Sequence, residues 1–174
     1  MVETDKPGTD FLADVVTKWE REIDCIAELK IRTVKLRISV VLSGDGGALV
    51  QMAKPIKYYA GAALGSGNQF LSWIHLDDLC RLFIKAIEDQ QWQGAYNAVA
   101  PEVVTNEELT KAIAKKIGRP ILLPNVPAFV LKILLGEMAD LVLKGSKLSS
   151  EKIIKSGFAF EFDTLEKALD NLYK

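Results

Sequence analysis

The stretch Gly65–Asp89 constrains the fold of this chain most strongly, because it joins a glycine turn, a short apolar run and an amphipathic helix. Its later apolar residues recur with the spacing of one helix face, at Leu76, Leu79, Cys80, Phe83, Ile84 and Ile87. Ligands of α/β proteins bind at strand-to-helix corners of this kind. We therefore expect a substrate site at this corner, formed by Gln69, Ser72, Trp73 and His75.

The one long strand that the sequence predicts is Thr33–Leu42, where apolar residues alternate with mostly polar ones. Central parallel strands are apolar throughout, so this mixed face indicates an edge, a cleft or a polar helix surface. Shorter strands are expected at 69–74, 95–100, 121–123 and 158–162, and helices at about 10–30, 48–58, 76–88, 105–117, 128–144, 149–156 and 164–173. This order predicts an α/β fold with few strands and mostly helical content. A boundary near Pro124–Pro127 divides the chain into residues 1–126 and a small helical region, 127–174.

The composition excludes several functions. The net charge is −1 and the charges are interspersed, which argues against a nucleic-acid or anionic-membrane partner. The N-terminus is acidic and polar, unlike a signal or transit peptide, so a cytoplasmic protein is expected. Cys25 and Cys80 are expected to be reduced and mostly buried. The most apolar run, Ala128–Leu143, is too short to span a bilayer, and we expect a helix buried within the chain.

No complete catalytic or cofactor motif is present in the sequence. The glycine loops at 44–47 and 65–67 lack the G-x-G-x-x-G spacing and the following strand with a ribose-binding acid. His75 is the only histidine, and the cysteines are well separated, so no metal site is expected. Ser72, His75 and Asp77 lie too close in sequence for a hydrolase triad and lack a nucleophile elbow. A cofactor-independent hydrolase is therefore the least favoured of the functions considered.

Two charged positions keep more than one interpretation. Asp77 and Asp78 could be paired acid–base carboxylates, but first-turn partners of the helix dipole, one of them facing solvent, is the preferred reading. Arg37, on the mixed face of the long strand, either meets an anionic ligand in a cleft or pairs with a helix carboxylate.

Four stretches, in this order, resemble one known family. LRISVVLSGDGGAL, GSGNQFLSWIHLDDL, GAYNAVAPEVVTNEEL and PAFVLKILLGEMADLVLKGSKL resemble the C-terminal half of extended short-chain dehydrogenase/reductases. The nearest group is the epimerase-like family often labelled nucleoside-diphosphate-sugar epimerase, some members of which carry a cell-division-inhibitor label. The resemblance covers about Asp10 to Tyr173. It implies the end of a Rossmann-like domain with a substrate-binding segment over 1–126, and a characteristic C-terminal helical region over 127–174.

The resemblance also implies which parts lie outside this chain. The N-terminal half of the family holds the glycine-rich turn that binds NAD(P) and the catalytic tyrosine and lysine, so no catalytic residue is assigned here. NAD(P), with NADP ahead of NAD, is expected as the cofactor of a longer parent protein, and none is expected for this chain alone. Carried over by position, the strand residues that would run past the nicotinamide end are Arg37, Ile38, Ser39, Val40, Val41 and Leu42.

The activity implied by the resemblance is a reductase or epimerase acting on a small molecule. Relatives that act on sugar nucleotides commonly carry an arginine–acid pair where this chain has Leu71 and Ser72. Since leucine cannot pair with a diphosphate, a less charged substrate is expected. The alternative is a non-enzymatic interaction module that uses the apolar helix 128–143 as a docking face. Because the long strand would have lost its neighbours, self-association, as a homodimer for example, is expected.

Overall fold

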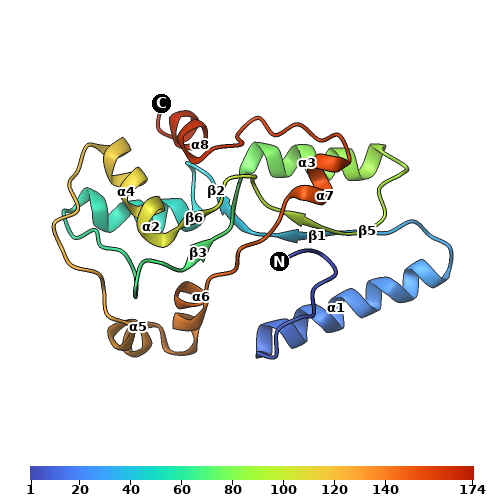
Figure 1. Cartoon of the computed structure of the whole chain (residues 1–174), viewed down its shortest axis with the longest axis horizontal. Helices are drawn as coiled ribbons and strands as arrows, with labels where there is room; N and C mark the ends of the chain where they lie inside the picture. The colour runs from blue at the N-terminus through green and yellow to red at the C-terminus, as the bar shows by residue number, and fades with distance from the viewer.

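Helices and short strands alternate along the chain, which gives an α/β fold with few strands and mostly helical content (Figure 1). The computed structural model describes the backbone of residues 1–174 and every side chain except those of Leu135 and Leu141. The helices are α1 (Phe11–Glu28), α2 (Gly47–Lys57), α3 (Leu76–Glu88), α4 (Asn106–Ile117), α5 (Ala128–Leu135), the 3-10 helix η1 (Gly136–Met138), α6 (Ala139–Leu143), α7 (Glu151–Lys155) and α8 (Leu165–Leu172). The strands are β1 (Val34–Ile38), β2 (Val40–Leu42), β3 (Phe70–Leu71), β4 (Trp73–His75), β5 (Gly94–Ala98) and β6 (Val104–Thr105).

The predicted long strand 33–42 is in fact two strands. It is interrupted at Ser39, whose backbone N–H donates to Ala98 O over 3.2 Å, while the next N–H, that of Val40, donates to Ser72 O over 3.1 Å. The strand thus changes partner: β1 pairs in parallel with β5, and β2 pairs in parallel with β4. A third pair, β3 with β6, is antiparallel.

Two predicted strands are absent from the described backbone, and both predictions are wrong. Residues 121–123 are irregular and lie between Pro120 and Pro124, where proline supplies no N–H for a ladder. Residues 158–162 are also irregular, because the N–H groups of Glu161 and Phe162 donate to the side chain of Asp78 rather than to a neighbouring strand.

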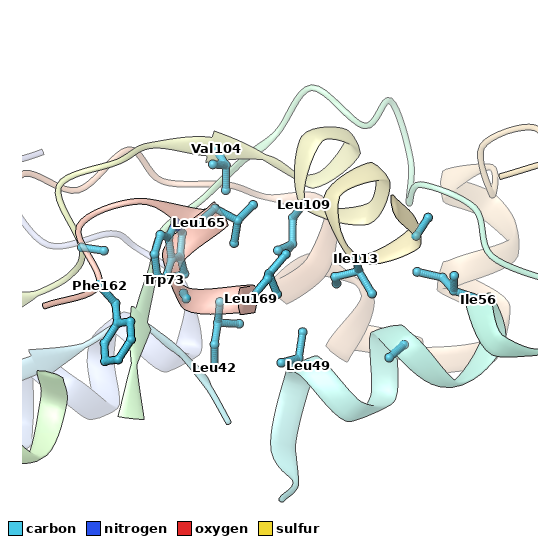
Figure 2. Packing of buried hydrophobic residues seen from close by; sticks show 14 residues of the cluster. Leu42, Leu49, Ile56, Trp73, Val104, Leu109, Ile113, Phe162, Leu165 and Leu169 are labelled. Atoms are coloured by element: carbon cyan, nitrogen blue, oxygen red, sulfur yellow. The ribbon is translucent and has the colours of Figure 1, made fainter. Parts of the chain in front are cut away.

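Two apolar cores hold these elements together. The larger lies between α2, α4 and α8, where Figure 2 shows Leu49, Leu109 and Leu169 gathered with residues of β2 and β4. The smaller lies on one face of the β1–β5 pair, under α3 and α7, and contains Leu82, Trp92 and Ile153. Since α8 shares the larger core with α2 and α4, residues on both sides of the predicted boundary at 126/127 pack together.

The apolar run 128–143 is neither continuous nor buried, so that prediction is wrong. Gly136, at a positive φ of 58°, ends α5, and the chain re-enters a helix only at α6 after a 3-10 turn. Phe129, Ile133 and Leu134 are 65%, 79% and 72% exposed, whereas Leu131 is buried. The tail helix α8 packs on α4 rather than on α5, which leaves the apolar side of α5 open in the described structure.

The two cysteines also differ from expectation. Cys25 on α1 and Cys80 on α3 are both exposed free thiols, so the prediction of mostly buried side chains is wrong. Both occupy the solvent side of their helices, where apolar spacing alone does not separate a core position from a surface one.

None of the described helices is both long and apolar enough to cross a membrane.

Candidate functional site

Parts of the two sets of predicted site residues lie on neighbouring strands, whereas Arg37 and Ile38 lie on β1, which pairs with β5. In the parallel pair β2–β4, Val40 is opposite Trp73, Val41 is opposite Ile74, and Leu42 is opposite His75. Both strands end at the same side and continue towards the helices α2 and α3. The structure therefore brings residues 40–42, the expected cofactor side, against residues 72–75, the expected substrate side.

Gln69 and Ser72 are tied to the C-terminal part of the chain. The Gln69 side-chain amide donates to Leu64 O over 2.8 Å and to Val142 O over 3.0 Å. The Ser72 hydroxyl donates to Ser146 O over 2.6 Å and accepts from the Leu148 N–H over 3.1 Å. These bonds fix residues 142–148, which we call the strap, over the loop that precedes β4.

The strap crosses this loop at a glycine. A Cβ atom at Gly145 would clash with the backbone carbonyl oxygen of Phe70, so only glycine permits the approach. Lys147 follows, with its ammonium 5.5 Å from the centre of the Phe70 ring. The corner predicted from Gly65–Asp89 is thus closed on one side by residues about 75 positions later in the chain, a contact that local sequence pattern does not reveal.

Trp73 is completely buried in the larger core, together with Leu42 of β2 and Leu169 of α8. Its indole N–H has no hydrogen-bond partner among the described residues. Trp73 therefore supports the corner from the core side and presents no exposed surface in this chain.

His75 is also buried, at 2% exposure, and acts as the N-cap of α3. Its Nδ1 accepts from the Asp77 N–H over 3.1 Å, and its ring stacks on Phe162 with centroids 3.8 Å apart. Burial lowers the pKa of His75, although the negative charges of Asp77 and Asp78 act to raise it. Among the described side chains, its Nε2 has no hydrogen-bond partner.

Arg37 forms an ion pair with a helix carboxylate, as one of the two interpretations of the sequence predicted. Its Nε and Nη2 donate to the Glu20 carboxylate over 2.6 Å and 2.8 Å, and its Nη1 donates to Glu3 O over 3.0 Å. This contact raises the pKa of Arg37 and lowers that of Glu20. The guanidinium is thus bound to α1 rather than presented to a ligand.

The other strand residues offer an apolar and partly open surface. Ile38 is 49% exposed, Val40 and Val41 are half-buried, and Leu42 is fully buried. Ser39 donates its hydroxyl to Ala98 O over 2.8 Å, so it too is engaged.

Asp78 makes long-range contacts that neither of its sequence interpretations included. It is completely buried and accepts from the N–H groups of Glu161 and Phe162 over 3.0 Å and 2.9 Å, and from Arg81 Nη1 over 2.7 Å. Asp77 is 62% exposed, so the expectation that one of the two acids faces solvent is confirmed. The signal available in the sequence was that Asp78 adjoins Leu79 and Leu82 on the inner face of α3.

The described side chains form no group that could hold a metal ion. Two shallow hollows lie along α3, one beside Phe158 and one beside Val34 and Leu36, and neither is lined by a predicted site residue. At the corner, the side chains of Gln69 and Ser72 are hydrogen-bonded within the chain, whereas the Trp73 indole N–H and His75 Nε2 have no partner among the described residues.

Comparison with known proteins shows what this chain is similar to. A family model described as a domain of unknown function, DUF1731, matches residues 126–172. The epimerase family protein YfhF of Bacillus subtilis is 42% identical over 163 residues, which are 94% of this chain and 53% of that protein. The chloroplastic homolog of epimerase family protein SDR39U1 from Arabidopsis thaliana is 40% identical over 167 residues, 96% of this chain and 48% of that protein. The chain spans about half the length of the curated relatives that it matches.

Solved structures agree with this similarity. The crystal structure of human epimerase family protein SDR39U1 (isoform 2) with NADPH aligns with a TM-score of 0.88 at 32% identity, covering 99% of this chain and 59% of that one. The nucleoside-diphosphate sugar epimerase of Corynebacterium glutamicum aligns with a TM-score of 0.79 at 27% identity, covering 99% of this chain and 33% of that one. UDP-glucose 4-epimerase of Thermus thermophilus with NAD, at 17% identity and a TM-score of 0.67 over 92% of this chain and 53% of that one, shows a shared fold alone. Together these findings support an epimerase-like family.

Proposed function

We propose that this chain is the substrate side of an NAD(P)-dependent reductase or epimerase of the epimerase family, and that the cofactor-binding half lies in sequence outside it. The observation that carries the proposal is the alignment of 99% of the chain with an NADPH-bound epimerase family protein, of which it covers 59%. The adjacent strands β2 and β4 supply the wall of the reaction site.

The residues of this chain fit one end of a nicotinamide cofactor and not its pyrophosphate. The exposed Ile38 and the half-buried Val40 and Val41 are suited to apolar contact with a ring. The nearby cation, Arg37, is bound to Glu20 and so is unavailable to a phosphate. Pyrophosphate binding also requires a glycine turn that presents backbone N–H groups at a helix start, and neither glycine loop of the sequence has its spacing.

In this proposal, the bound nicotinamide would exchange a hydride with a carbonyl or alcohol carbon of the substrate. The task of this chain is to position that substrate. Gln69 and Ser72 hold the strap against the corner, and the strap with the loop 64–72 would form the substrate wall. The proton donor and its lysine partner would come from outside the chain, because no tyrosine in the sequence is followed by a lysine four residues later. With Leu71 and Ser72 in place of an arginine–acid pair, we propose a substrate less charged than a sugar nucleotide.

Hydrogen exchange in a complete protein tests this placement. The part of the Bacillus subtilis relative that this chain does not match would be joined to the chain, and amide exchange measured with and without NADPH. We expect NADPH to slow exchange at residues 38–42 and to leave α4 unchanged as the internal control. Protection confined to other elements of this chain, with none at 38–42, would contradict the proposed cofactor side.

A further inference from the structure

Two stretches of the chain carry lysine and arginine but no acidic residue. The first runs from residue 46 to 76 and contains Lys54 and Lys57. The second runs from residue 109 to 136, and its cations are Lys111, Lys115, Lys116, Arg119 and Lys132. The net charge of −1 conceals this local excess of positive charge, because the acidic residues lie elsewhere in the sequence.

The fold brings the C-terminal ends of α2 and α4 together. The two helices pack against each other. Just beyond their ends, Arg119 donates to the Tyr59 hydroxyl, with its guanidinium 4.7 Å from the centre of the Tyr59 ring. Tyr59 has a positive φ of 60°, a conformation that is costly for a residue other than glycine and that this contact helps to hold. Both acid-free stretches thus meet at one end of the molecule, on the left in Figure 1.

Several cations at this end are open to solvent. Lys111 and Lys116 are paired with carboxylates, over 2.5 Å in each case. The exposed lysines that form no salt bridge among the described side chains are Lys54, Lys57 and Lys115. Basic side chains in the last turn of a helix interact favourably with its dipole, but that interaction leaves their ammonium groups available to an anionic partner.

Exposed apolar side chains continue this surface. The segment between α4 and α5 runs down the left end of the molecule in Figure 1 and carries Leu122 and Leu123, which are 68% and 48% exposed. On α5, the exposed apolar side chains are Phe129, Ile133 and Leu134. Figure 1 shows α1, β1 and β5 towards the opposite end, so the open edge of β1 is not part of this surface.

We propose that this surface, which comprises the C-terminal ends of α2 and α4, the segment 118–127 and α5, binds the face of a bilayer that contains anionic lipids. Lysines attract anionic headgroups, and each cation near the surface strengthens binding about fivefold. Exposed leucine, isoleucine and phenylalanine side chains enter the boundary between headgroups and acyl chains. The proposal goes beyond the proposed function and does not depend on it.

The aliphatic side chains favour a lipid surface over a nucleic acid. Single-stranded nucleic acids stack their bases on aromatic rings, whereas Leu122, Ile133 and Leu134 offer no ring. Lys132, which has apolar neighbours on α5, can extend its ammonium towards headgroups while its methylene groups stay among apolar side chains. Because none of the described helices could cross a membrane, the protein would lie on the bilayer. The expectation that no membrane is bound rested on net charge and interspersed charges, which do not hold for residues 109–136.

Flotation with lipid vesicles tests the charged part of the surface. The protein used is the chain joined to the part of the Bacillus subtilis relative that it does not match. We expect binding to phosphatidylcholine vesicles that contain phosphatidylserine, little binding to phosphatidylcholine alone, and weaker binding as salt rises. Lys54→Gln with Lys57→Gln should weaken binding about tenfold or more. Lys18→Gln with Lys155→Gln, the same charge change on α1 and α7, should weaken it less than about threefold.

A second pair of variants tests the apolar part at constant charge. Phe129→Gln with Ile133→Gln should weaken vesicle binding about tenfold or more. Ile84→Gln with Ile154→Gln, at exposed positions of α3 and α7, should weaken it less than about threefold. Circular dichroism checks that each variant is folded.

Three results would overturn the proposal. The first is no flotation with phosphatidylserine vesicles at low salt. The second is flotation that neither the double lysine variant nor the double α5 variant weakens, because the contact would then lie on another surface. The third is binding of a single-stranded oligonucleotide in place of vesicles, which would assign the surface to a nucleic acid. None of them affects the proposed function, which is tested separately through protection by NADPH at residues 38–42.

Discussion

At the residue scale, His75 and Asp78 join the start of α3 to the C-terminal part of the chain. His75 caps the helix and stacks on Phe162, and Asp78 accepts the N–H groups of Glu161 and Phe162. The sequence was enough to predict a first-turn acid and a histidine at a helix entry. It could not show that the carboxylate of Asp78 receives donors 83 and 84 positions later, because such a contact depends on tertiary packing and not on local spacing.

Replacing Asp78 should therefore be costly. Asp78→Ala would leave the buried N–H of Phe162, the part-buried N–H of Glu161 and the Arg81 guanidinium without their acceptor. We expect a loss of about 3 kcal/mol or more in the free energy of unfolding. The matched control is Asp77→Ala at the exposed neighbour, for which about 1 kcal/mol or less is expected. Denaturant unfolding compares the two, and equal losses would show that Asp78 is not an anchor.

His75 should give the chain a specific pH dependence. Because burial lowers its pKa in the folded state, the unfolded chain binds the proton more tightly near its ordinary value of about 6.5. Stability is then complete above that value and falls as the pH decreases below it towards the folded-state pKa. No other histidine contributes.

Unfolding free energies measured between about pH 5 and 7.5 check this dependence. The control is His75→Asn, which keeps a side-chain acceptor for the N-cap but does not titrate in this range. The variant should lose the slope near pH 6. An unchanged slope would mean that another group is responsible.

At the scale of elements, amphipathic spacing predicted α1 to α4 and α8 close to their observed bounds, and the capping box of Thr105 and Glu108 is present at the start of α4. Apolar spacing did not predict which faces are covered. The helix at 128–144 ends early because Gly136 adopts a positive φ, and its apolar side remains exposed. The strap likewise cannot be predicted from the local sequence pattern, because its hydrogen bonds join Gln69 and Ser72 to backbone groups of the C-terminal part.

Two leucines of α5 test which side of this helix is buried and which is exposed. Leu131 is buried, so Leu131→Ala should cost about 2–5 kcal/mol in the free energy of unfolding through lost burial and a cavity. Leu134 is 72% exposed, and Leu134→Ala should change it by about 0.5 kcal/mol or less. Thermal or denaturant unfolding of both variants decides the matter; a large loss for Leu134→Ala would place this side of α5 in a contact.

At the scale of the whole molecule, β2 and β4 meet at one corner, and the edge of β1 away from β5 has no strand partner in the described structure. The chain matches about half of its relatives' length. The α/β class and the position of the corner were predictable, because they rest on spacing and on four quoted stretches. The change of partner at Ser39, the commitment of Arg37 to Glu20 and the open edge of β1 were not, because each depends on which strands and helices become neighbours.

The most direct test of the central claim is calorimetric titration of NADPH into two proteins: this chain alone, and the chain joined to the unmatched part of the Bacillus subtilis relative. Without a phosphate-binding turn, apolar contact at residues 38–42 should not offset an association cost of about 4–15 kcal/mol. We therefore predict no measurable binding to the chain alone and micromolar or tighter binding to the joined protein. Micromolar binding of NADPH by the chain alone would contradict the account.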